Sequence, residues 1–215
     1  MSGLHIIDDR ARDISPDVLD EQGRLRILPA EYWRTTTAAE RALLCVRRAL
    51  YCIPTVELVA RLRELIGSRK AIEIGSGNGV LAAALGIPAT DNRMQEMPRY
   101  RQVYESMGQP TITYGANVDP YDAHAAVRLY RPQVVVAAWV THKYERLRHE
   151  AGGNEIGVDE DRIIDSVESY IVIGNRGVHA GKKIWGRPHT IEHPDYLYSR
   201  AMNGLPDFIA EWKRE

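Results

Sequence analysis

Residues 71–81 read Ala-Ile-Glu-Ile-Gly-Ser-Gly-Asn-Gly-Val-Leu, and this stretch decides the fold. Its first four residues predict a short buried strand, which three glycines at every second position then interrupt. The apolar residues 80–85 predict a helix that begins directly after the glycines. Strand, glycine turn and helix are together typical of the first unit of a nucleotide-binding α/β sheet, because glycine permits the tight turn and lets a ligand approach bare backbone.

The spacing of the glycines distinguishes two kinds of ligand. A dinucleotide fingerprint reads G-x-G-x-x-G and would place its third glycine at Val80. In this chain the third glycine is Gly79, and an acid, Glu73, stands two residues before Gly75. The pattern E-x-G-x-G-x-G resembles motif I of the class I S-adenosylmethionine-dependent methyltransferases. A glycine-rich turn in some other α/β protein is one alternative, and another nucleotide-dependent α/β enzyme is a second.

The resemblance carries expectations for the whole chain. It implies a doubly wound, Rossmann-like α/β sheet of about seven strands with helices on both faces. It also implies S-adenosylmethionine as the cofactor, with Gly75, Gly77 and Gly79 against its methionine and ribose parts. The acid at Glu73 would order the glycine loop or contact the amino group of the cofactor, directly or through water.

An acid after the second strand is a further match to the family. Residues 87–91 predict a weak strand, because Pro88 cannot donate to a strand ladder. In the family an acid at this strand end bonds the ribose hydroxyls, and Asp91 has the right type and place. It lies a few residues closer to Glu73 than is usual. A turn former or helix cap is the alternative role for Asp91.

The third strand of the family is followed by an acidic site that contacts the adenine amino group. Residues 111–114 predict this strand, and Asp122 and Ala123 resemble the acidic site because a helix follows them directly. The alternative is that Asp122 caps this helix, and the two roles can coexist.

Residues 132–139 predict the clearest strand, apolar throughout from Val134, as suits a central strand that is covered on both faces. Ligands in open α/β sheets bind beyond the carboxyl ends of strands. Trp139, at this end, is therefore predicted to bind the cofactor, with an acceptor pocket or the core as alternatives. His142, three residues later, is the candidate general base, since imidazole accepts a proton near neutral pH. An exposed loop histidine is its alternative role.

The strand end also limits the class of acceptor. Amino-directed DNA and protein-glutamine methyltransferases carry an Asp/Asn-Pro-Pro-Tyr type of motif here, where this chain reads Ala-Ala-Trp-Val at 137–140. No cysteine follows the strand, so a 5-methylcytosine mechanism is not supported either. We therefore expect methyl transfer to a small molecule or a protein rather than to a DNA base. A non-catalytic or degenerate S-adenosylmethionine-binding module is the alternative function.

The remaining elements divide the chain into an N-terminal extension, 1–54, and a cofactor-binding domain, 55–215. Within the extension, strands are expected at 5–7 and 24–28, and Thr37 and Glu40 predict a capping box before a helix. In the domain, helices are expected at 55–66 and 159–167, and a fifth strand at 169–174. Residues 196–198 and 207–212 are expected to form the antiparallel sixth and seventh strands.

Composition excludes several classes of protein. The 215 residues are 44% hydrophobic and 27% charged, with a net charge of −1, so no strong field attracts nucleic acid or a membrane. The N-terminus is polar rather than signal-like, and a cytoplasmic protein with reduced Cys45 and Cys52 is expected. Residues 179–193 hold three histidines, but no ligand spacing predicts a metal site. The sequence does not indicate the methyl acceptor or the oligomeric state.

Overall fold

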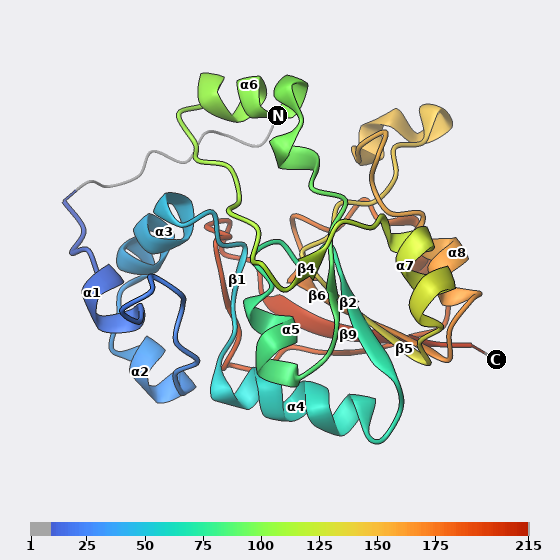
Figure 1. Cartoon of the computed structure of the whole chain (residues 1–215), viewed down its shortest axis with the longest axis horizontal. Coiled ribbons are helices and arrows are strands. Elements are labelled where there is room, and N and C mark those ends of the chain that lie inside the picture. The colour runs from blue at the N-terminus through green and yellow to red at the C-terminus, as the bar shows by residue number, and fades with distance from the viewer. Residues whose placement is uncertain (1–9, 215) are drawn as a thin grey trace.

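The structure is a computed structural model that describes residues 10–214, so the strand expected at 5–7 lies outside the described residues. Within them, seven strands form one sheet in the order β4-β3-β2-β5-β6-β9-β7 (Figure 1). β9 is antiparallel to both of its neighbours, and the other pairings are parallel. The strands are β2 (Ala71–Ile74), β3 (Ala89–Thr90), β4 (Val118–Asp119), β5 (Val134–Ala138), β6 (Ser169–Asn175), β7 (Thr190–Glu192) and β9 (Asp207–Lys213). The expected Rossmann-like sheet is confirmed.

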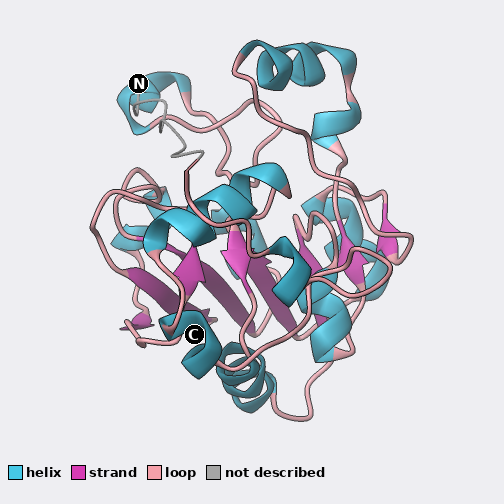
Figure 2. Ribbon diagram, turned by 90° about the vertical axis from the view of Figure 1, so that its left-hand side faces the viewer, coloured by secondary structure: helices cyan, strands magenta, loops and turns pink. Residues whose placement is uncertain are grey.

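Helices cover both faces of this sheet (Figure 2). Because side chains alternate along a strand, Val134 and Val136 of β5 join the apolar cluster on one face, and Val135 and Ala137 join the cluster on the other. β5 is thus buried on both sides, as its apolar sequence predicted. The first face carries α4 (Val56–Ile66) and α5 (Val80–Leu85), and the second carries α7 (Ala123–Tyr130) and α8 (Glu160–Ile164).

The third parallel strand lies later in the chain than expected. Residues 111–114 form no strand, and β4 takes that place four residues further on. The N–H group of Ile112 donates to Gln95 Oε1 at 2.8 Å instead of to a neighbouring strand. The insertion between β3 and β4 therefore crosses the glycine loop instead of extending the sheet. It contains the 3₁₀ helix η1 (Met94–Glu96) and α6 (Pro98–Ser106), which stands apart from the sheet at the top of Figure 1.

The prediction of a sixth strand at 196–198 is wrong. The sixth strand of the sheet is β7, earlier in the chain, and β9 confirms the strand expected at 207–212. Residues Tyr198–Ser199 form β8, which pairs antiparallel with β1 (Cys52–Ile53) in a separate two-stranded sheet. The residues after β7 therefore connect the N-terminal segment to the rest of the chain. The 3₁₀ helices η2 (Arg146–Ala151) and η3 (Lys183–Gly186) complete this half.

The described part of the N-terminal extension, residues 10–54, is called the N-terminal segment and has an apolar cluster of its own. Trp33, Leu44 and Ile53 are buried in it, and Tyr198 from the C-terminal half packs against them. Residues 24–28 form only isolated bridges, so the strand expected there is wrong. The helices of this segment are α1 (Ser15–Val18), α2 (Ala30–Arg34) and α3 (Ala38–Arg47). A domain boundary at residue 54 stays a prediction.

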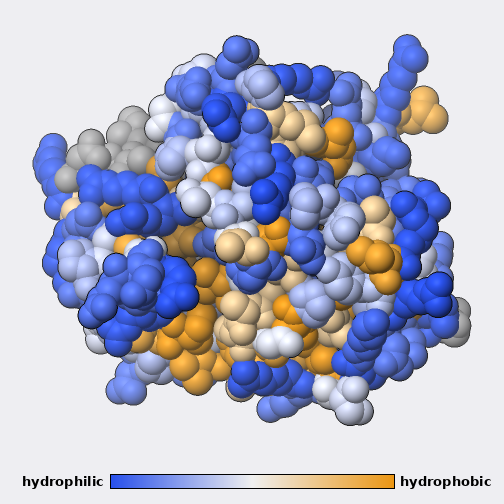
Figure 3. All heavy atoms as spheres, viewed as in Figure 1, coloured by the Kyte–Doolittle hydropathy of each residue, from blue (hydrophilic) through white to orange (hydrophobic). Residues whose placement is uncertain are grey.

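The surface is polar over most of the face shown in Figure 3, with apolar atoms gathered where α4 and α5 lie in Figure 1. Val56, at the start of α4, is 47% exposed. In residues 10–214 no helix combines the length and the apolar character needed to cross a membrane. The apolar atoms in this view belong to the region of α4 and α5, which pack on the sheet.

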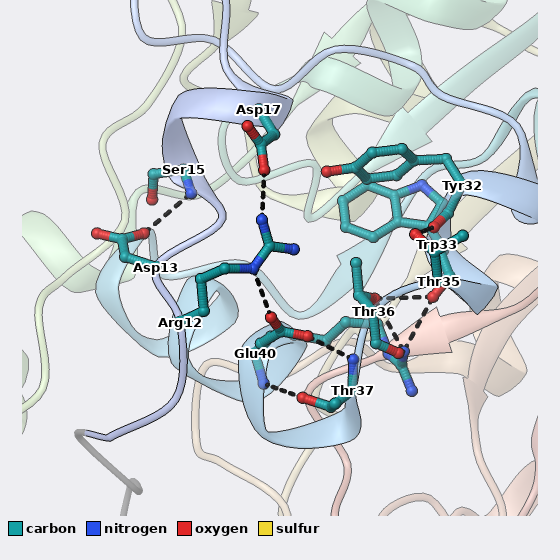
Figure 4. A network of polar contacts seen from close by, with 11 residues as sticks. Arg12, Asp13, Ser15, Asp17, Tyr32, Trp33, Thr35, Thr36, Thr37 and Glu40 are labelled. Carbon is teal, nitrogen blue, oxygen red and sulfur yellow. Dashed lines mark hydrogen bonds and ion pairs between the residues drawn. The ribbon is translucent and has the colours of Figure 1, made fainter.

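The predicted capping box at the start of α3 is confirmed (Figure 4). Glu40 N–H donates to Thr37 Oγ1 at 3.2 Å, and Thr37 N–H donates to Glu40 Oε2 at 2.6 Å. Arg12 adds a charged partner, because its Nε donates to Glu40 Oε1 at 2.8 Å. The hydrogen bonds from Thr37 and Arg12 lower the pKa of Glu40 to about 2.

Replacing Glu40 with glutamine should remove a pH-dependent part of the stability. The folded pKa lies below the ordinary value of 4.5, so the carboxylate stabilises the fold above about pH 4.5, and this stabilisation is lost as the pH falls toward 2. An amide keeps the capping geometry. Urea unfolding at about pH 6 and about pH 3 should show a larger loss of unfolding free energy for the wild type than for the variant. Equal losses would contradict this account.

Candidate active site

The glycine loop between β2 and α5 packs so closely that two of its glycines leave no room for a side chain. A Cβ on Gly75 would lie 2.6 Å from Val140 Cγ1, and one on Gly79 would lie 2.7 Å from a side-chain atom of β4. At Gly77 the nearest atom is Ile112 Cδ1, 3.4 Å away, and the φ of +56° favours glycine. Gly75 and Gly79 therefore serve packing, whereas Gly77 is the more open position.

Two buried carboxylates hold this loop. Asp91 Oδ2 accepts the N–H of Gly77 at 2.9 Å, and its Oδ1 accepts the N–H of Arg93 at 2.8 Å. Glu73 Oε2 accepts the N–H of Ala82 in α5, also at 2.9 Å. Burial raises the pKa of both carboxyls, to about 8 for Glu73, where the charge of Asp91 adds to the effect. A ligand that donates hydrogen bonds would stabilise their ionised forms.

Asp122 caps α7, so the capping alternative is confirmed. Its Oδ1 accepts the N–H groups of His124 at 2.9 Å and Ala125 at 3.0 Å. The residue is exposed, and within the described chain its Oδ2 makes no hydrogen bond. A second role toward a ligand is therefore compatible with the cap, and the adenine contact stays a prediction.

A cavity of about 540 Å³ lies beyond the carboxyl ends of β2, β3 and β5, within the size range of small-molecule sites. It brings together seven of the predicted residues: Glu73, Gly75, Gly77, Asp91, Asp122, Ala123 and Trp139. Gly79 is not among its lining residues, and its N–H donates to the Ser76 carbonyl within the turn. The cavity thus joins residues from four separate segments at one edge of the sheet.

His142 does not face this cavity. It lines a second cavity of about 280 Å³, most of whose lining side chains are charged. The positive φ of Trp139, 60°, turns the chain directly after β5, and His142 then bridges to Val158. Its Nε2 is buried and has no hydrogen-bond partner among residues 10–214, and burial lowers the pKa of the imidazole. The expectation that His142 borders the glycine loop as a base is not met.

A buried ion pair, which sequence reasoning missed, supports the wall of the main cavity. Lys182 Nζ lies 2.8 Å from both carboxylate oxygens of Glu160 and donates to the carbonyl oxygen of Val140 at 3.0 Å. The Tyr170 hydroxyl donates to Glu160 Oε1 at 2.8 Å. Because the Val140 side chain packs on Gly75, Val140 links the ion pair to the glycine loop. No local pattern around Lys182 marks it as buried.

Three further lining residues, also missed, come from segments far apart in the sequence. Tyr51 lies near the end of the N-terminal segment, and Gln95 and Tyr104 belong to the insertion before β4. Gln95 Nε2 donates to the hydroxyls of Tyr51 at 3.2 Å and Tyr104 at 3.1 Å. Tyr51 also lies beside Trp139, with 6.2 Å between ring centroids. The density of tyrosine and methionine at 94–107 was a signal for Gln95 and Tyr104, whereas no such pattern surrounds Tyr51.

The C-terminal histidines lie elsewhere. His189 stacks on Trp212 with 5.2 Å between ring centroids, and His193 Nδ1 lies 2.8 Å from the Asp207 carbonyl oxygen. Over residues 10–214 no three His, Cys, Asp or Glu side chains gather in a way that could hold a metal ion. His179 is buried against Trp139, and burial lowers its pKa to about 3, so this ring is neutral.

The strand order, the reversed β9 and the glycine loop after the first sheet strand give the chain the Rossmann-like fold of the class I methyltransferases. No protein-family model and no curated protein matches the sequence. Several solved structures match the chain only distantly.

Three of these structures show how low the similarity is. A structure of WbdD with the kinase inhibitor LY294002 is 10% identical with a TM-score of 0.41, over 98% of this chain and 47% of WbdD, so this chain spans about half of that protein. An rRNA methylase from Streptococcus thermophilus is 14% identical with a TM-score of 0.41, over 73% of this chain and 94% of the methylase. The Pyrococcus abyssi tRNA (uracil-54, C5)-methyltransferase, in complex with S-adenosyl-L-homocysteine, has the same identity and TM-score, over 73% of this chain and 37% of its own.

Replacing Lys182 with methionine should strongly destabilise the protein, because it leaves Glu160 buried without its cation. Removing one partner of a buried pair costs about 3–5 kcal/mol of unfolding free energy. Lys183→Met is the matched control, since the neighbouring side chain is 59% exposed and pairs with Asp161 at the surface. Urea denaturation should show a much smaller loss for the control. Equal losses for the two variants would contradict the structural role of Lys182.

Proposed function

We propose that this chain is an S-adenosylmethionine-dependent methyltransferase that acts on a small molecule. The observation that carries the proposal is the position of Asp91, which is only 7% exposed yet lines the cavity. Its carboxylate holds the glycine loop through the N–H of Gly77. A buried acid beside an open glycine, at the carboxyl ends of parallel strands, suits a ligand that carries hydroxyl groups.

The residues of the cavity fit the parts of this cofactor. Asp91 would accept hydrogen bonds from the ribose hydroxyls, and Oδ2 of Asp122 would accept one from the adenine amino group. The backbone at Gly75 and Gly77 would lie against the methionine part, where a Cβ on Gly77 would project toward Ile112. These assignments follow the family resemblance, and the geometry around each residue is compatible with them.

The bound cofactor would supply an activated methyl group on a sulfonium. The residues of this chain then bind the cofactor and the acceptor, orient them and exclude water. Methyl transfer needs the two reacting atoms held in line, and such positioning supplies much of the rate enhancement. We assign no general base, because His142 lines a different cavity.

A small acceptor is favoured by the size of the cavity and by the side chains that line it. Tyr51 from the N-terminal segment and Tyr104 from the insertion before β4 both line it and meet, with 3.2 Å between their hydroxyl oxygens. The cofactor and the acceptor would share about 540 Å³. A base within a duplex would have to leave its stack to enter this space.

Isothermal calorimetry with S-adenosylhomocysteine tests the proposal. The wild type should bind this compound and not NAD, because the glycine spacing departs from the dinucleotide pattern. Asp91→Asn should bind it at least about tenfold more weakly, because a charge-assisted hydrogen bond contributes about 1.5–3 kcal/mol. Asp122→Asn is the matched control and should lose less, because that residue is exposed. Tight binding of NAD without any response to S-adenosylhomocysteine would contradict the proposal.

A further inference from the structure

The cavity has two chemically different ends. The acids Asp91 and Asp122 follow β3 and β4, on one side of the glycine loop. On the other side, the Trp139 ring meets the edge of His179, which follows β6, with 5.2 Å between centroids. We call the group formed by Tyr51, Gln95, Tyr104 and Trp139 the aromatic end. Trp139 follows β5, whereas Gln95 and Tyr104 come from the insertion after β3, and none of the four side chains is charged.

One hydroxyl hydrogen of the pair formed by Tyr51 and Tyr104 has no acceptor in the described part of the chain. The amide nitrogen of Gln95 carries two hydrogens and donates one to each hydroxyl. The Tyr51 and Tyr104 oxygens lie 3.2 Å apart, so one hydroxyl donates to the other. The hydrogen of the remaining hydroxyl has no acceptor among residues 10–214. Burial raises the pKa of Tyr104, which keeps its hydroxyl protonated.

Trp139 supplies a second donor without a partner. Its Nε1 is buried and makes no hydrogen bond within the described chain, although the residue lines the cavity. The other two indoles of the C-terminal half differ, because Trp185 Nε1 donates to the His179 carbonyl and Trp212 Nε1 to the Ile184 carbonyl, at 2.8 and 2.9 Å. A buried donor without an acceptor is uncommon in folded proteins and calls for a ligand or a water.

The two hydroxyls are held in fixed positions. The Arg200 guanidinium lies 4.6 Å from the centroid of the Tyr51 ring, and the backbone N–H of Arg200 donates to the backbone carbonyl of Tyr51. The amide oxygen of Gln95 is also held, because Oε1 accepts the backbone N–H of Ile112 at 2.8 Å. A ligand that enters the aromatic end would therefore meet a hydroxyl donor that needs no rearrangement, which favours binding, whereas the buried Trp139 N–H becomes available only if the indole turns.

We propose that the aromatic end is the methyl-acceptor subsite and takes a small planar aromatic molecule whose edge carries hydrogen-bond acceptors. The rings of Tyr51 and Trp139 would contact its face or edge. The unpartnered hydroxyl would donate to one of its ring nitrogen or oxygen atoms, and the Trp139 N–H would donate to another once the indole turns toward the ligand. The role of the aromatic end as an acceptor subsite rests on the proposed methyltransferase function. The binding of an aromatic molecule there does not depend on that function.

The indole N–H signals in ¹⁵N-resolved NMR test this directly, with isoquinoline as the probe and naphthalene as the probe of similar shape without an acceptor atom. The protein is first saturated with S-adenosylhomocysteine. Isoquinoline should then move the Trp139 signal, assigned with Trp139→Phe, and leave those of Trp185 and Trp212 in place. Naphthalene should bind more weakly. An unmoved Trp139 signal, or equal binding of the two probes, would overturn the proposal.

Matched variants locate the hydroxyl donor. One of the variants Tyr51→Phe and Tyr104→Phe removes the hydroxyl hydrogen that has no acceptor. That variant should bind isoquinoline about fivefold more weakly, as expected for the loss of one neutral hydrogen bond. Affinity for S-adenosylhomocysteine should stay unchanged, which also shows that the variant is folded. Tyr100→Phe, on the same helix, is the control and should bind isoquinoline like the wild type. Wild-type binding by both Tyr51→Phe and Tyr104→Phe would contradict the proposal.

The two proposals fail in different ways. If S-adenosylhomocysteine does not bind but isoquinoline still moves the Trp139 signal, the methyltransferase function fails, and the subsite with it, although the aromatic end still binds. If S-adenosylhomocysteine binds and competes with isoquinoline, the aromatic end belongs to the cofactor site, and only the subsite proposal fails. Displacement of isoquinoline by a single-stranded RNA oligonucleotide would likewise overturn it, in favour of a nucleobase acceptor.

Discussion

Lys182 joins the framework of the sheet to the cavity through one buried ammonium group. It pairs with Glu160 on α8 and donates to the Val140 carbonyl just beyond β5. Val140 in turn packs so closely on Gly75 that a Cβ there would clash. Val140 therefore connects the glycine loop, and with it the floor of the cavity, to an ion pair on the opposite face of the sheet from α4 and α5.

The features that could be predicted from the sequence are those encoded by neighbouring residues. The glycine loop, the cap at Thr37 and the buried strand at 134–138 each depend on a short pattern, and the structure has all three. Asp91 was placed correctly at the cavity because it follows a strand that pairs with β2. The parallel arrangement of the strands then brings their carboxyl ends to one edge.

The failures have a common physical origin, since each depends on contacts between distant segments. His142 was assigned by its distance along the chain from β5, but the left-handed backbone at Trp139 redirects everything that follows. Residues 111–114 have the composition of a strand, yet Gln95 takes the N–H that a sheet would have used. Lys182 and Tyr51 look like ordinary loop residues until the fold buries or pairs them.

The order of the last strands also bears on how the chain is made. β7 precedes β9 in the sequence, yet in the described sheet it pairs with β9 and with no other strand. During synthesis β7 therefore emerges from the ribosome without a strand to pair with. Its edge of the sheet closes only after residues 207–213 have left the exit tunnel. The four strands nearest the glycine loop, β4, β3, β2 and β5, are complete by residue 138, so this part of the sheet can begin to assemble while translation continues.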